Sequence, residues 1–244
     1  MSPRPSAIAL FAGFWMVATG SALAQDLGEE PALIHLPQPN LKSSVSVEEA
    51  LAGRRSIRSY GAEALSLAEL SQVLWAAQGM TEPIEGTPDG FSWEWRGGFR
   101  TAPSAGALYP LEVYVVVGDV DGLEAAAYRY LPVENALEFA IPGDLRASLS
   151  QAAHRQGVIS AAPAVLVISG VVERTAAKYG ERAEQYVLIE VGAAAENAFL
   201  QCESLGLATV TVGAFVDQEV KEVLRLPDGE EAYALMPIGH RGPQ

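Results

Sequence analysis

The chain has 244 residues, of which 49% are hydrophobic, and its formal net charge is −14 at pH 7. This apolar content is enough for a large folded core, whereas the acidic charge argues against nucleic acid or an anionic membrane surface as a partner. One cysteine, Cys202, and three scattered histidines provide neither a disulfide framework nor the spacing of a metal site.

The first 24 residues have the pattern of a signal peptide. Arg4 precedes an apolar run, and Ala22 to Ala24 form a small-x-small cleavage motif. We therefore expect a periplasmic or secreted protein, with no stable membrane span after cleavage. An uncleaved anchor is the alternative, although the run is short for a full span. Residues 25–45 contain three prolines and predict an extended arm, and residues 46–244 are expected to form the folded domain.

Two capping boxes predict the first two helices. Ser46 is followed three residues later by Glu49, and Ser66 by Glu69 in the same way. Gly79 is typical of the position that ends a helix. Residues 81–100 are rich in turn formers. A loop of this length inside a compact domain is usually functional, and we interpret it as a lid over an active site.

Strands and helices then alternate, which suggests layers of helices around one sheet. The expected strands cover residues 111–118, 163–170, 208–215 and 232–241, and a hairpin pairs 128–131 with 137–140. Asp144 and Asp217 are expected to cap short helices. Residues 186–206 predict a long helix that is apolar or small on nearly every face, so it must be buried all round or packed on a partner chain.

Arg54, Arg55 and Arg58 form a basic cluster, with Ser56, at the predicted end of the first helix. The whole chain has 16 basic residues, so three within five positions indicate an anion site. Guanidinium groups bind phosphate through paired, charge-assisted hydrogen bonds. The alternative is a solvated helix end, where arginines interact favourably with the helix dipole. The residues alone leave both interpretations open.

Two turns in the sequence are poor in side chains. Residues 101–110 are TAPSAGALYP, and residues 211–215 are TVGAF. Such turns let a backbone approach a flat ligand closely, although packing alone would also explain them. Together with the arginine cluster they are consistent with a planar, phosphorylated cofactor. Glycine-rich nucleotide motifs and a nucleophile elbow are absent, and a hydrolase built on Ser104 lacks a recognisable His-acid pair.

Five segments resemble the nitroreductase family, in the order seen there: RRSIRSY, PSAGALYPLEVYVV, KYGERAEQYVLIEVGAAAENAFLQCESLGL, TVTVGAF and MPIGHR. The chain is most similar to the SagB-type branch, which includes azoline-oxidising flavoenzymes, and the resemblance covers about residues 46–241. It implies an α+β three-layer sandwich with a mixed, mainly antiparallel sheet, surrounding helices and a buried central helix. It also implies a homodimer with FMN at the interface.

The resemblance assigns roles to particular residues. Those expected to hold the FMN phosphate and ribityl chain are Arg54, Arg55, Ser56, Arg58, His240 and Arg241. Those expected to line the isoalloxazine ring are Pro103, Ser104, Ala105, Gly106 and Leu108, with Val212, Gly213 and Ala214 near its reactive nitrogen. Lys178 and Tyr179 match a Lys-Tyr pair linked to proton removal, and the alternative for Lys178 is a solvated loop position.

The expected function is an exported, FMN-dependent oxidoreductase that transfers hydride to or from a small organic substrate, such as a quinone, a nitro compound or an azoline. Export argues against a nicotinamide donor, which is scarce outside the cytoplasm. The alternative is an exported flavin-binding module without turnover.

Overall fold

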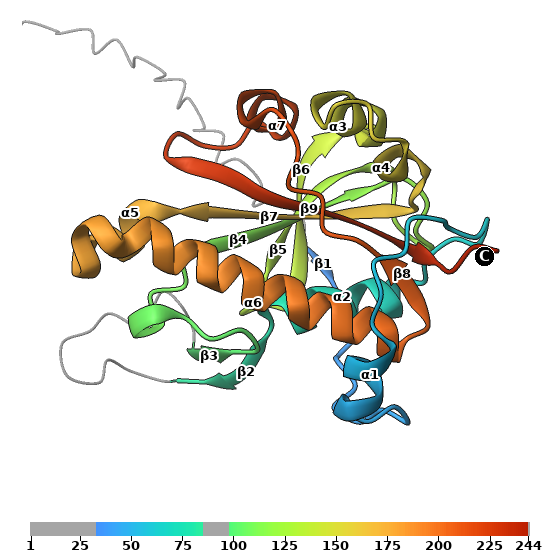
Figure 1. Cartoon of the computed structure of the whole chain (residues 1–244), viewed down its shortest axis with the longest axis horizontal. Helices are drawn as coiled ribbons and strands as arrows, with labels where there is room; N and C mark the ends of the chain where they lie inside the picture. Colours follow the sequence, from blue (N-terminus) through green and yellow to red (C-terminus); the bar gives the residue numbers. More distant parts are fainter. Residues whose placement is uncertain (1–32, 85–97, 244) are drawn as a thin grey trace, which may run out of the picture. The chain divides into compact units, whose positions relative to one another are not determined.

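The structure is a computed structural model that describes residues 33–84 and 98–243. The predicted signal peptide and most of the predicted lid lie outside these ranges. The described residues form three layers, with one seven-stranded sheet between two groups of helices (Figure 1). The predicted α+β sandwich is confirmed.

The sheet has the strand order β1-β6-β5-β4-β7-β9-β8, and every ladder between these neighbours is antiparallel. The one parallel contact among the described residues is an isolated bridge between Leu65 and Val120. The strands are β1 (Ile34–His35), β4 (Leu111–Val117), β5 (Ala126–Leu131), β6 (Ala136–Pro142), β7 (Ala164–Val171), β8 (Leu207–Thr209) and β9 (Glu230–His240).

Three of the sequence expectations about strands need correction. Part of the predicted arm pairs with β6 as β1, so it belongs to the sheet. The ends of the predicted loop 81–100 form a hairpin, β2 (Met80–Pro83) and β3 (Gly98–Arg100). The strand expected over 208–215 stops at Thr209, and after it only Val212 forms a bridge, to Leu235.

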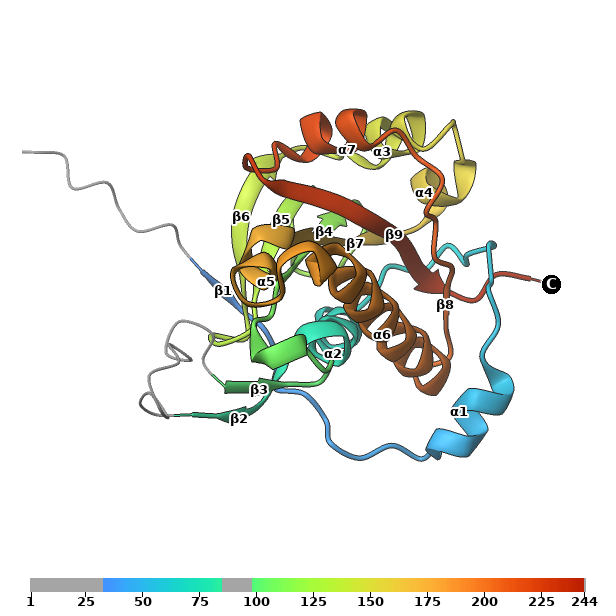
Figure 2. The same cartoon turned by 60° about the vertical axis from the view of Figure 1, so that its left-hand side comes forward.

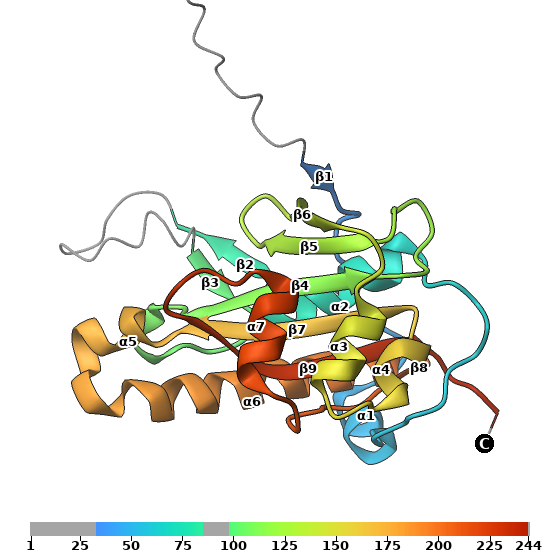
Figure 3. The same cartoon turned by 90° about the horizontal axis from the view of Figure 1, so that it is seen from above.

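Helices cover both faces of the sheet (Figures 2 and 3). Figure 2 shows α2 and α6 on one face and α3, α4 and α7 on the other. The helices are α1 (Val47–Gly53), α2 (Leu67–Gln78), α3 (Arg146–Ala152), α4 (Gly157–Ala161), α5 (Val172–Tyr179), α6 (Ala183–Ser204) and α7 (Asp217–Leu224), with short 3-10 turns η2 (Ala105–Ala107) and η3 (Gly180–Arg182).

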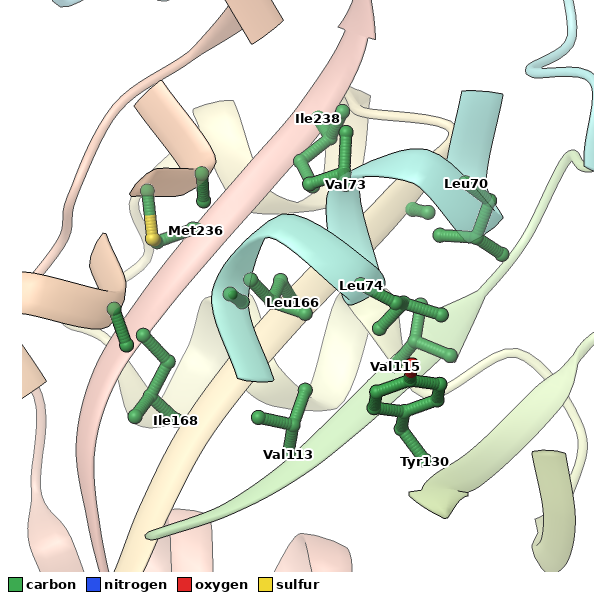
Figure 4. Close-up of a cluster of buried hydrophobic side chains, with 14 of the residues drawn as sticks. Leu70, Val73, Leu74, Val113, Val115, Tyr130, Leu166, Ile168, Met236 and Ile238 are labelled. Atoms are coloured by element: carbon green, nitrogen blue, oxygen red, sulfur yellow. The ribbon is translucent and has the colours of Figure 1, made fainter. Parts of the chain in front are cut away.

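Alternation along the central strands divides the core into two parts. In β4, Val113 and Val115 pack with α2 and α6, whereas Tyr114 and Val116 pack with α3, α4 and α7. Because successive side chains of a strand point to opposite faces, a strand buried on both sides needs an unbroken apolar run. Figure 4 shows the α2 side of this core, with Leu74 among the strand residues.

The helix starts confirm the predicted capping boxes and correct the other caps. Ser46 with Glu49 and Ser66 with Glu69 both make the reciprocal hydrogen bonds. The residue that precedes α3 is Leu145 and the one that precedes α7 is Val216, so neither expected aspartate occupies the cap position. Gly79 ends α2 with φ −66°, a conformation that any residue can adopt. Glycine is needed there for space, because an added Cβ would lie 2.1 Å from the Trp75 ring.

Helix α6 is buried along one side and exposed along the other. Its inward side includes Ala194, Ala198 and Cys202, and burial raises the pKa of the Cys202 thiol to about 12. Its outward side exposes Leu188 (51%) and Ile189 (62%). No described helix combines the length and apolar content needed to cross a bilayer. The helix is therefore not buried all round within this chain.

Truncating a core residue of α2 is expected to destabilise the fold strongly. Leu74 is fully buried, so Leu74→Ala should lower the free energy of unfolding by about 2–5 kcal/mol through lost transfer energy and the cavity left behind. Leu41, which is 76% exposed, provides the control, and Leu41→Ala should change stability by less than about 0.5 kcal/mol. Denaturant unfolding measures both, and equal effects would contradict this packing.

Candidate active site

The first group of predicted site residues gathers around the carboxyl-terminal end of α6. The segment after α1 runs beside β8, where Ile57 N–H donates to Thr209 O at 2.9 Å. It then meets the end of β9, where Gly61 N–H donates to His240 O at 2.9 Å. Three segments far apart in the sequence, 54–61, 207–209 and 240–241, are thereby brought together.

Two arginines of this group lie against the same part of α6. The Arg54 guanidinium lies 5.2 Å from the centre of the Phe199 ring. Arg241 donates from Nη2 to Glu203 Oε2 at 2.5 Å and from Nε to Leu207 O at 3.2 Å. Phe199 and Glu203 are one helical turn apart, so they share a face of α6. Arg54 and Arg241 therefore contact neighbouring turns on one face of α6, and we call this region the arginine end.

The other residues predicted to join the arginine end have varied contacts. Arg55 donates to Ala52 O and Arg54 O at 3.1 and 2.8 Å, which is the helix-end alternative. Ser56 and Arg58 are exposed. His240 Nε2 lies 3.6 Å from Glu69 Oε2 on α2, because neighbours on a strand point to opposite sides. The structure therefore does not bring the His240 side chain to Arg241.

The second small-residue turn follows β8. Val212 exchanges two backbone hydrogen bonds with Leu235, at 2.8 and 3.0 Å. Gly213 and Ala214 are exposed, and an added Cβ at Gly213 would meet no atom within 4 Å. The Ala214 carbonyl accepts from Gln156 Nε2 at 2.9 Å. The turn is thus anchored at both ends and presents bare backbone between them.

The second group of predicted site residues lies beside the amino-terminal half of α6. Gly106 has φ +62°, and an added Cβ would lie 2.9 Å from Tyr179 Oη and 3.0 Å from Lys178 Nζ. The positive φ favours glycine at this position, and the Gly106 backbone lies close to the ends of both side chains. The Tyr179 ring also packs edge-on against Tyr186 with centroids 5.0 Å apart. The predicted pair Lys178-Tyr179 thus contacts the predicted ring-lining segment 103–108.

A salt-bridge network holds helix α5, which carries this pair, against the start of β4. Arg174 on α5 pairs with Glu112 Oε1 at 2.5 Å, and Arg129 on β5 pairs with Glu112 Oε2 at 2.9 Å. Burial raises the pKa of Glu112, but the two guanidinium groups outweigh it, so that the pKa is lowered. Arg174 precedes Lys178 by one helical turn, so the network fixes the position of the Lys-Tyr pair.

The sequence analysis did not predict a role for Glu190, which forms a hydrogen bond with the segment 103–108. Its Oε1 accepts a hydrogen bond from Ala105 N–H at 2.8 Å, and its side chain is buried. Burial raises the Glu190 pKa. Hydrogen bonds from Ala105 N–H and the Ser104 hydroxyl lower it, but the effect of burial is larger and the pKa is raised. The sequence did contain a signal for this residue, because Glu190 is the single charged residue in the apolar stretch YVLIEVGAAA. Pro103 is exposed beside it, and Leu108 N–H closes the turn on Ala105 O at 3.3 Å.

Asn197, the polar position predicted on the central helix, has a structural contact. Its Nδ2 donates to Thr101 O at 3.2 Å and so ties α6 to the start of the segment 101–110. Across residues 33–84 and 98–243, no three His, Cys, Asp or Glu side chains lie close enough together to hold a metal ion.

The two groups of site residues lie on opposite faces of α6. Glu190 supports the segment 103–108, and Phe199 contacts Arg54. They are nine positions apart (199 − 190), which is roughly 180° around a helix of 3.6 residues per turn and about 13 Å along its axis. Within a single chain, α6 therefore lies between the arginine end and the segment that contacts the Lys-Tyr pair.

Comparisons with known proteins match most of the chain. The nitroreductase family model matches residues 51–240. MJ1384 of Methanocaldococcus jannaschii, named as a presumed nitroreductase, is 42% identical over 197 residues, which are 81% of this chain and 92% of that protein. The microcin B17-processing protein McbC of Escherichia coli is 30% identical over 135 residues, which are 52% of this chain and 48% of that protein.

Solved structures give the same result for the fold. The crystal structure of a presumed nitroreductase from Ralstonia eutropha JMP134 has a TM-score of 0.72 and 30% identity, covering 89% of this chain and 93% of that one. The NADPH:FMN oxidoreductase of Vibrio harveyi has a TM-score of 0.56 and 19% identity, covering 81% and 69%. At that identity the second likeness concerns the fold alone.

Proposed function

The chain belongs to the nitroreductase family, and on this basis we propose that it is an FMN-dependent oxidoreductase. Its substrate is a small organic molecule such as a quinone, a nitro compound or an azoline-like ring. Bound flavin supplies the hydride transfer, and the protein supplies binding, orientation and electrostatics. The observation that most supports this proposal is that Arg54 and Arg241 contact residues one turn apart on the same face of α6.

The arginine end has the chemistry required for a phosphate. A guanidinium group carries five N–H donors, and Arg241 uses Nε and Nη2 for its contacts with Leu207 and Glu203. Its other donors and the partly exposed Arg54 are suited to phosphate oxygens. Glu203 balances the charge of Arg241, which keeps a cationic cluster compact while no anion is bound.

The two glycine turns fit the attached ring. Gly106 and Gly213 leave backbone where side chains would otherwise stand, and the Gly106 backbone lies against the Lys-Tyr pair. A flat ring system needs such close backbone approach on its edges. Lys178 and Tyr179 are then placed to hold or move a proton at the substrate, at Nζ and Oη respectively.

A homodimer would complete the site. Since the two groups lie on opposite faces of α6, a two-fold axis near this helix would set the arginine end of one chain beside the Lys-Tyr pair of its partner. The exposed Leu188 and Ile189 on α6, with Val47 and Leu51 on α1, provide apolar surface for such packing. The flavin would then lie between the two chains, and each dimer would contain two sites.

Optical absorption of the purified protein tests the proposed function. We expect a yellow protein with flavin bands, which bleach on addition of a reductant and recover on addition of a quinone or nitro compound. Stable bands that never respond to a reductant and acceptor pair would identify a flavin-binding module without turnover. A colourless protein that gains no flavin band when FMN is added would contradict flavin binding altogether.

We also propose that the enzyme works outside the cytoplasm. The support is the charged, apolar and small-residue pattern of residues 1–24, which lie outside the described residues. In that location a donor other than a nicotinamide would reduce the flavin. Fractionation of cells that express the full chain measures the location, and recovery in the cytoplasm alone would contradict it.

A further inference from the structure

The turn formed by residues 104–109 has an unfavourable backbone conformation, and we call it the 104–109 turn. Gly106, Ala107 and Tyr109 all have a positive φ, of +62°, +52° and +44°. Residues with side chains rarely adopt this left-handed conformation, and those that do are held in it by surrounding contacts. Tyr109 is 3% exposed, so its ring is enclosed by the protein. The conformation of the turn therefore depends on the groups that bond to it.

Glu190 of α6 supplies such contacts at the start of the turn. Its Oε1 accepts from Ala105 N–H at 2.8 Å, and the Ser104 hydroxyl acts on the same carboxylate. The oxygen of that hydroxyl accepts from Tyr109 N–H at 2.8 Å. Ser104 thus links the carboxylate to the far end of the turn. Glu190 is 4% exposed, and hydrogen bonds to a charged group are stronger where water is excluded.

The middle of the turn lies against the Lys-Tyr pair. A Cβ added at Gly106 would lie 2.9 Å from Tyr179 Oη and 3.0 Å from Lys178 Nζ, so this backbone and the two polar side-chain ends are close neighbours. Tyr186, one helical turn before Glu190 on α6, packs edge-on against the Tyr179 ring with centroids 5.0 Å apart. One face of α6 therefore reaches the pair in two ways, directly through Tyr186 and through the turn that Glu190 contacts.

We propose that Glu190 is a positioning residue for the Lys-Tyr pair. Its carboxylate holds the 104–109 turn in the left-handed conformation, and the turn in turn sets Lys178 Nζ and Tyr179 Oη in place. In this role Glu190 acts through the backbone of the turn and touches neither the substrate nor the flavin. The part of the pair in proton transfer rests on the proposed function, whereas the effect of Glu190 on the turn and on the pair's position depends only on the contacts above.

NMR of the flavin-free protein tests the position of the turn. In Glu190→Ala, Ala105 N–H loses its acceptor and should exchange with solvent about 10- to 100-fold faster, the size of one hydrogen bond to a charged group. The ring signals of Tyr179 should shift as well. Glu190→Gln keeps an oxygen for Ala105 N–H and should stay close to wild type. Asn197→Ala is the matched control, because Asn197 also bonds from α6 to this loop, but at Thr101 O, outside the turn.

Turnover of the flavin-loaded enzyme separates positioning from stability. Glu190→Ala should lower kcat by about 10- to 100-fold, because proton transfer is slow when its groups are displaced, while KM for a quinone changes little. The solvent deuterium isotope effect on kcat should rise for the same reason. Glu190→Gln should restore both values. Asn197→Ala, which removes a tether of the same loop, should lower stability and leave kcat and the isotope effect unchanged.

Ser104→Ala provides the same test if Glu190→Ala does not fold. Exchange at Tyr109 N–H should then rise by about tenfold, while Ala105 N–H stays protected by Glu190. Unchanged exchange in either variant would overturn the proposal, and so would an unchanged isotope effect in Glu190→Ala or equal losses of kcat in Glu190→Ala and Asn197→Ala. A wild-type protein that takes up no flavin would contradict the flavoenzyme alone, because the NMR measurements decide the position of the turn and of the pair without flavin.

Discussion

Replacing Arg54 and Arg241 together by alanine is expected to weaken FMN binding by about 10²- to 10⁴-fold. Each guanidinium contributes charge-assisted hydrogen bonds to the phosphate, and such bonds are worth roughly 1.5–3 kcal/mol each. Fluorescence titration of the flavin-free protein with FMN measures the change. The same titration with riboflavin, which lacks the phosphate, should show little difference between the variant and the wild-type protein.

Arg155→Ala is the matched control for this experiment. Arg155 is exposed, follows α3 on the other face of the sheet, and contacts only Gln151 through a side-chain hydrogen bond at 3.3 Å among the described residues. Its loss removes one positive charge, half of what the double variant removes, without touching the arginine end. If Arg155→Ala weakens FMN binding as much as the double variant, net charge rather than a phosphate site controls affinity. Equal losses for FMN and riboflavin would also exclude phosphate recognition.

The central strands of the sheet were predictable from the sequence, because a strand that is buried on both faces is apolar at consecutive positions. Residues 113–117 and 164–168 are continuous apolar runs, and the structure places both strands in the middle of the sheet. The edges were not predictable in this way. Strand β1 has two residues and β8 has three, so neither contains enough alternation to show a period. Their pairing is decided by tertiary contacts.

The arginine end was predictable by residue type but not by direction. The motif RRSIRSY marks three arginines equally, yet Arg54 reaches α6 whereas Arg55 turns back to its own helix. That difference arises from the backbone at the end of α1, where Arg54 has φ −51° and ψ 124°. The sequence could have predicted that the side chains of His240 and Arg241 point to opposite sides, because adjacent residues in a strand do so.

The position of the two site groups on opposite faces of α6 required the structure. The helix itself was expected, and its period gives the angle between any two of its residues. Which loops contact those faces depends on where the segments 54–61 and 103–108 pack, and no local pattern encodes this. The proposed division of the site between two chains rests on helix geometry combined with two tertiary contacts, Ala105 to Glu190 and Arg54 to Phe199.

Mixing two inactive variants is expected to restore activity if the site is shared between chains. Lys178→Ala should bind FMN normally but reduce turnover by about 10²- to 10⁴-fold, the usual contribution of a positioned proton donor or acceptor. The Arg54→Ala, Arg241→Ala variant should lack bound flavin. In a mixed dimer, one site receives the intact arginines of the first variant and the intact Lys-Tyr pair of the second. The other site carries both defects.

Refolding or co-expression of the two variants in equal amounts should therefore recover about a quarter of the wild-type turnover per chain, because half of the dimers are mixed and each has one intact site. Lys178→Ala mixed with Gly106→Val is the matched control. Gly106 contacts Lys178 and Tyr179 in the same chain, so these two defects affect the same half of the site and no combination of chains restores it. No recovery with the arginine variant would show that each chain forms its own complete site and that α6 does not separate the two groups. Recovery in the Gly106→Val control would show that Gly106 and Lys178 act in different sites.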